Sequence, residues 1–95
     1  LCGKSTASNM RTLDLSDNEI KGQLSDCWGR LSSLVFLDLS NNKLSGKIPP
    51  SMTTLANLEV LVLRNNSFIG ELPSTLKNCT NLAILDLSEN LLSGS

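Results

Sequence analysis

Residues 34–50 read LVFLDLSNNKLSGKIPP, and they set the pattern for the whole chain. Leucines at 34, 37 and 39 are followed by Asn42 and Leu44, then by Gly46 and an Ile-Pro pair. The same order recurs every 24 residues, with leucine at 13, 37, 61 and 85. A repeat of this length predicts a solenoid, in which each repeat forms one coil and neighbouring coils bury a shared core.

Each coil is predicted to contain one short strand. In residues 37–39 the two leucines face one side and Asp38 faces the other. Parallel pairing of adjacent coils at about 4.8 Å stacks each leucine on its equivalent. Steps of three between Met52, Leu55 and Leu58 favour a 3-10 or irregular arc on the convex side. The chain therefore predicts a right-handed β-solenoid arc, with a short parallel sheet on its concave face.

A column of asparagines follows the strands, where the chain turns inward. Backbone groups buried at such a bend need partners, and an amide side chain both donates and accepts hydrogen bonds. We expect these side chains to bond the backbone of neighbouring coils as a ladder: Asn18, Asn42, Asn66 and Asn90. Gly46 and its equivalents permit a positive φ or a close approach between coils.

The columns place residues 1–95 in a single repeat segment. It comprises a partial coil at 1–9, coils at 10–33, 34–57 and 58–81, and a partial coil at 82–95. Solenoids need polar caps, and neither end resembles one, so we expect a fragment of a longer protein. No apolar run approaches the roughly 18 residues of a membrane span, so no transmembrane segment is expected within these residues.

Residues 37–50 resemble the plant-specific leucine-rich repeat, L-x-x-L-x-L-x-x-N-x-L-x-G-x-I-P. That class fills the ectodomains of plant receptor-like kinases, receptor-like proteins and polygalacturonase inhibitors. The strings at 25–28 and 76–82 further resemble repeats of disease-resistance receptor-like proteins. The sequence departs from the pattern at Ser25, where proline is usual, and at Val62 and Arg64, where aspartate and serine are frequent.

The resemblance implies noncovalent recognition by part of a plant cell-surface immune receptor-like protein. It implies an extracellular location, glycosylation, and a protein, peptide or oligosaccharide ligand such as a microbial elicitor. A co-receptor kinase would act with the full-length protein, whose membrane anchor lies elsewhere. Two alternatives remain open: a soluble inhibitor of a pathogen cell-wall-degrading enzyme, and a short autonomous defence peptide.

Composition excludes several other classes. The net charge is −1 and aromatic residues make up 3%, which leaves no basic or base-stacking surface for nucleic acid. The chain has no histidine, so it has no His-based catalytic site and no His-ligated metal. Asp14 and Asp38 face each other across one coil spacing, but on a shallow surface that would not raise either pKa. We expect no catalytic residues, no metal site and no cofactor.

The concave strand face is the expected binding surface. Aspartates at the outward positions form a stripe that a basic or hydroxyl-rich ligand would suit, although the same residues equally serve to solvate the strands. Val62 and Arg64 interrupt that stripe and are the residues expected to give specificity. Phe36 is a candidate anchor in a mostly apolar column. The predicted binding residues are Asp14, Phe36, Asp38, Val62, Arg64 and Asp86.

Cysteines and sequons complete the candidates. Cys79 occupies an inward column, which predicts a buried free thiol. Cys2 and Cys27 lie 25 residues apart on adjacent coils, within the range of a disulfide; two free thiols are the alternative. Asn65 and Asn78 each begin an N-x-S/T sequon, and both are predicted to be exposed glycan acceptors.

Overall fold

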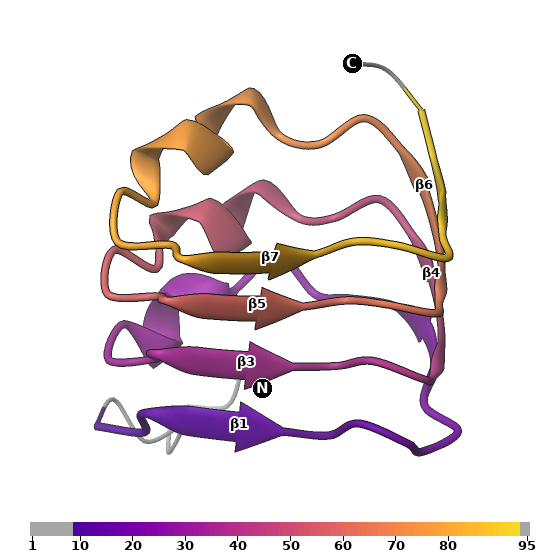
Figure 1. Cartoon of the computed structure of the whole chain (residues 1–95), viewed down its shortest axis with the longest axis horizontal. Helices are drawn as coiled ribbons and strands as arrows, with labels where there is room; N and C mark the ends of the chain where they lie inside the picture. The colour runs from indigo at the N-terminus through magenta and orange to yellow at the C-terminus, as the bar shows by residue number, and fades with distance from the viewer. Residues whose placement is uncertain (1–8, 94–95) are drawn as a thin grey trace.

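The computed structural model describes residues 9–93, which wind into a stack of coils (Figure 1). One strand from each coil enters a first sheet, with the order β1-β3-β5-β7. Its strands are β1 (Thr12–Asp14), β3 (Phe36–Asp38), β5 (Val60–Val62) and β7 (Ile84–Asp86). All of its pairings are parallel, and Leu37 aligns with Leu13 on one side and with Leu61 on the other. The predicted leucine-rich fold with a short parallel sheet is confirmed.

A second parallel sheet, with the order β2-β4-β6-β8, was not predicted. Its strands are β2 (Lys21–Gln23), β4 (Lys43–Gly46), β6 (Ser67–Gly70) and β8 (Leu91–Leu92). From the sequence, only a turn at Gly46 and its equivalents was predicted in this part of each coil. Because each coil lies one strand spacing from the next, the extended segments beyond the asparagine column also come within pairing distance. Gly46 has φ +78°, and a Cβ there would lie 2.7 Å from Cγ of Gln23 on the preceding coil.

Three 3-10 helices complete the described coils on the side away from both sheets, as the steps of three predicted. They are η1 (Trp28–Leu31), η2 (Pro50–Thr54) and η3 (Ser74–Asn78). Pro49 and Pro73 precede η2 and η3, in extended conformations that deliver the chain into the helical turn. Within residues 9–93, no helix is long and apolar enough to cross a membrane.

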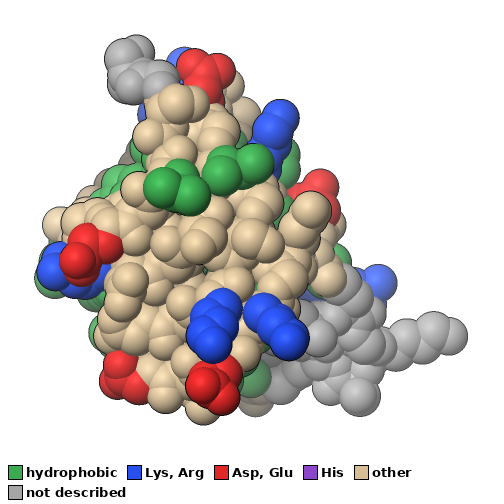
Figure 2. Space-filling view, turned by 90° about the vertical axis from the view of Figure 1, so that its right-hand side faces the viewer, with side chains coloured by type: hydrophobic (Ala, Val, Ile, Leu, Met, Phe, Trp, Pro, Cys, Tyr) green, Lys and Arg blue, Asp and Glu red, His purple; other side chains and the backbone are tan. Residues whose placement is uncertain are grey.

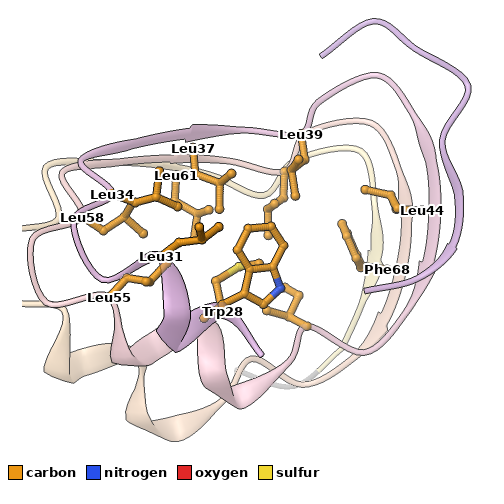
Figure 3. Packing of buried hydrophobic residues seen from close by; sticks show 13 residues of the cluster. Trp28, Leu31, Leu34, Leu37, Leu39, Leu44, Leu55, Leu58, Leu61 and Phe68 are labelled. Atoms are coloured by element: carbon orange, nitrogen blue, oxygen red, sulfur yellow. The ribbon is translucent and has the colours of Figure 1, made fainter. Parts of the chain in front are cut away.

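The core lies inside the coils and is densest in the middle of the stack. Figure 3 shows Leu37, Leu61 and Trp28 pointing into the space that the coils enclose, and each of the three side chains is at most 1% exposed. Leu13 in β1 is only partly buried, and Leu85 in β7 is 41% exposed. Since each coil buries its leucines against the next, the inner coils hold most of the hydrophobic free energy.

Candidate functional site

The exposed side of the first sheet, which we call the strand face, carries two columns of outward side chains. Strand alternation turns the leucines inward and leaves these positions in solvent. The parallel register aligns the members of each column across adjacent strands. The first column is Thr12, Phe36, Val60 and Ile84, and the second is Asp14, Asp38, Val62 and Asp86.

The first column is apolar over three coils. Phe36 and Val60 are half-buried, whereas Ile84 is 55% exposed. Their alignment gives a continuous apolar stripe, running perpendicular to the strands. Exposed apolar area of this kind contributes to binding when a partner covers it.

The second column supplies carboxylates that also shape the chain. Oδ1 of Asp14 accepts hydrogen bonds from the backbone N–H of Ser16 at 3.0 Å and from its hydroxyl at 2.6 Å. Asp86 repeats this arrangement with Ser88. These bonds from serine, the hydroxyl first, lower the pKa of Asp14 and of Asp86, so both stay ionised. Asp14 and Asp86 therefore end β1 and β7 in a fixed turn, while their carboxylates stay partly exposed.

Val62 and Arg64 occupy different positions within this face. Val62 lies in register between Asp38 and Asp86, so it makes an uncharged gap in the acidic column. Arg64 reaches across to the next coil, where Nη1 donates to the Ser88 hydroxyl at 2.8 Å. Nη2 lies 2.9 Å from Oε2 of Glu89, and Nη1 lies 3.8 Å from Oδ2 of Asp86. Arg64 thus pairs with its own chain, and its side chain remains 48% exposed.

The asparagine ladder lies between the two sheets. Nδ2 of Asn42 donates to the carbonyl oxygens of Leu39 and Ser40 in its own coil and of Leu15 in the preceding one. Its Oδ1 accepts from the N–H of Ile20 at 3.1 Å. Each such side chain therefore ties two coils together through their backbones.

The first asparagine of the ladder differs from the other three. Asn66 and Asn90 bond a preceding coil in the same manner as Asn42. Asn18 is exposed, and within the described residues its bonds go only to Leu15 and Ser16 of its own coil.

A second, outer ladder runs beside the first and was missed in the sequence. Nδ2 of Asn65 donates to Oδ1 of Asn41 at 2.9 Å, and Nδ2 of Asn41 donates to Oδ1 of Asp17 at 2.8 Å. Asp17, Asn41, Asn65 and Glu89 all have φ between +56° and +58°. The signal was an Asp or Asn directly before each of the first three ladder asparagines, since these residues tolerate the left-handed region.

The cysteines have distinct environments. Cys79 is 5% exposed, is a free thiol as predicted, and donates to the Thr53 carbonyl oxygen at a sulfur–oxygen distance of 3.4 Å. Burial raises the pKa of the Cys79 thiol. Cys27 is not among the free cysteines. Cys2 lies outside the described residues, so its pairing with Cys27 stays a prediction.

Comparison with known proteins places this geometry in a family. A family model described as Leucine Rich repeats (2 copies) matches residues 8–51, and one described as Leucine Rich Repeat matches residues 57–79. The chain belongs to the leucine-rich repeat family. A search of curated proteins found no match.

Several solved structures with the same repeat are ectodomains or complexes of plant receptors. The BIR2 ectodomain of Arabidopsis thaliana is 36% identical with a TM-score of 0.85, over 88% of this chain and 44% of that one. The leucine-rich repeat ectodomain of the A. thaliana receptor kinase SOBIR1 is 41% identical with a TM-score of 0.83, over 86% and 45%. A chain of the Arabidopsis complex of the receptor kinase HAESA, the peptide hormone IDA and the co-receptor SERK1 is 42% identical with a TM-score of 0.87, over 93% and 15%.

This leucine-rich repeat chain spans less than half the length of each of these solved chains. Its repeats resemble those of plant receptor ectodomains in sequence as well as in fold.

Proposed function

We propose that the strand face binds a protein or peptide ligand without chemical change to either. The observation that carries this proposal is the apolar stripe of Phe36, Val60 and Ile84, which lies beside the column that contains the ionised Asp14 and Asp86. A stripe of this kind accepts apolar side chains, and fixed carboxylates accept hydrogen bonds from cationic ones. We therefore expect a ligand segment with alternating apolar and basic residues.

The second sheet offers a different surface. Figure 2 shows the side of the molecule that carries β4 and β6, where uncharged polar side chains and backbone separate small groups of charged and hydrophobic ones. Such a mixed surface lacks the continuous apolar stripe of the strand face, which makes the first sheet the better candidate for recognition.

The setting we propose is the extracellular part of a plant immune receptor-like protein that acts with a co-receptor kinase. Support comes from the matched ectodomains and from the complex in which HAESA is bound to a peptide hormone and a co-receptor. Two alternatives, a soluble inhibitor of a pathogen enzyme and a short defence peptide, would use the same fold. No feature of residues 9–93 favours either alternative.

Fractionation of the natural protein tests this setting. The complete protein, tagged and expressed in leaves, should appear in the membrane fraction and co-precipitate a SERK-type co-receptor ectodomain. Recovery from the apoplastic fluid as a soluble protein, with no co-receptor, would favour the inhibitor instead. A natural species of only 95 residues would favour the defence peptide.

A further inference from the structure

The two sequons lie in unlike surroundings. Asn65 belongs to the outer ladder, where its Nδ2 is already hydrogen-bonded to Asn41 and its backbone is held at φ +58°. Asn78 is the last residue of η3, on the opposite side of the coils. It is exposed, and no side-chain hydrogen bond to it occurs among the described residues. An N-linked sugar on Asn78 therefore displaces nothing, whereas one on Asn65 crowds a formed ladder.

Asn78 also borders an open hollow of about 530 Å³ between the 3-10 helices. Asp26 also lines the hollow, together with small residues and with four hydroxyl-bearing residues of η2 and η3: Ser51, Thr53, Thr54 and Thr75. Asp26 accepts a hydrogen bond from the Ser51 N–H at 2.9 Å, which fixes the carboxylate in place. Hydroxyls and a carboxylate beside small apolar groups are suitable partners for the O–H and N–H groups of a sugar.

We propose that Asn78 is the glycosylated sequon of this chain, that Asn65 is left unmodified, and that the first sugar lies in the hollow between η2 and η3. The donor is a lipid-linked oligosaccharide of the secretory pathway. The Asn78 amide nitrogen loses one proton and bonds the anomeric carbon, and the lipid diphosphate leaves with the electron pair of the broken C–O bond. This inference rests on the extracellular location proposed above, but not on the identity of the ligand.

The placement leaves the strand face open. Asn78 is on the side of the coils away from both sheets, so a glycan there leaves the stripe of Phe36, Val60 and Ile84 uncovered. The same glycan covers the η2–η3 side, which restricts macromolecular contacts to the sheets.

Peptide mass spectrometry of the chain, secreted from plant or insect cells behind a signal peptide, tests the site. Asn78 should carry a glycan and Asn65 should not. Asn78→Gln and Thr80→Ala should each abolish the glycoform, and Asn65→Gln should leave it unchanged. A glycan on Asn65, or an unmodified Asn78, would overturn the assignment. Neither result bears on ligand binding, which is measured separately.

Thermal unfolding tests the hollow. An endoglycosidase that leaves one sugar on Asn78 gives a protein to compare with the Thr80→Ala variant, which keeps Asn78 but lacks the sequon. The one-sugar protein should melt higher by at least about 2 °C, a shift readily measured for a domain of this size. Equal melting temperatures would show that the sugar extends into solvent, and would overturn its placement in the hollow.

Discussion

Nη2 of Arg64 lies 2.9 Å from Oε2 of Glu89, which belongs to the following coil. Arg64, one of the two outward residues that depart from the repeat pattern, is therefore held in place by its own chain. The same guanidinium donates to Ser88 and approaches Asp86. Arg64 therefore presents a fixed positive group next to the acidic column. A ligand carboxylate would bind there only by competing with Glu89.

Replacement of Arg64 separates folding from recognition. The pairs are exposed, and such pairs contribute about 0–1 kcal/mol, so Arg64→Ala should lower the melting temperature of this chain by no more than about 4–8 °C. Binding of ligand or co-receptor by the complete protein should weaken severalfold, and Val62→Ala should act in the same direction. Glu89→Gln serves as the control, since it frees Arg64 without removing it. Unchanged binding for Arg64→Ala would assign Arg64 to the solvated surface alone.

Removal of an inner ladder asparagine should destabilise the solenoid. Asn42→Ala leaves buried backbone groups of two coils without partners, at a cost of about 1–3 kcal/mol. Asn18→Ala is the matched control and should cost less, because Asn18 is exposed and bonds its own coil. Trp28 is the only tryptophan and is 1% exposed, so its fluorescence follows unfolding in urea. Equal urea midpoints for the two variants would show that the ladder does not contribute to the stability of the fold.

Thiol titration reports on the cysteines. The unfolded, unreduced protein should react with Ellman's reagent at one thiol, if Cys2 and Cys27 are paired. The folded protein should react slowly even there, because Cys79 is buried and its thiol pKa is raised. A count of three thiols would eliminate the disulfide.

Acid should weaken the turns that end the strands. A carboxyl whose pKa is lowered in the folded state stabilises it above the ordinary value of about 3.9, and the contribution disappears as the pH falls through the folded pKa. Asp14 and Asp86 both have lowered pKa values, with serine as the main cause. In Ser88→Ala, NMR titration should show the pKa of Asp86 rising toward its ordinary value while that of Asp14 stays low. An unmoved Asp86 would contradict the assigned cause.

Periodicity predicted the parts of this fold that depend on facing inward or outward. The leucines at 37 and 39 are buried and Asp38 between them faces outward, because a strand has only two sides. The inward position of Cys79 followed from its column in the same way. A 24-residue period fixes which side chains stack, so the strand face was predictable residue by residue.

Contacts between side chains were harder to predict from the sequence than burial was. The outer ladder depends on left-handed backbone at Asn41 and Asn65, which a hydrophobic pattern does not encode. The second sheet arises from coil spacing rather than from strand-forming residues, since β2 consists of Lys21, Gly22 and Gln23. Arg64 had several carboxylates within reach, and its choice of Glu89 depends on the rotamers of both side chains.

Binding by the strand face is tested most directly with two matched isoleucines. Ile84 lies on the strand face and is 55% exposed, whereas Ile69 lies on the second sheet and is 47% exposed, so neither contributes much to the core. Peptides selected from a random displayed library against the wild-type chain would be measured by calorimetry against Ile84→Ser and Ile69→Ser. We predict that Ile84→Ser weakens binding by at least about tenfold, the loss expected for an interface anchor, and that Ile69→Ser leaves it unchanged. Full binding to Ile84→Ser, or loss on Ile69→Ser, would contradict recognition by the strand face.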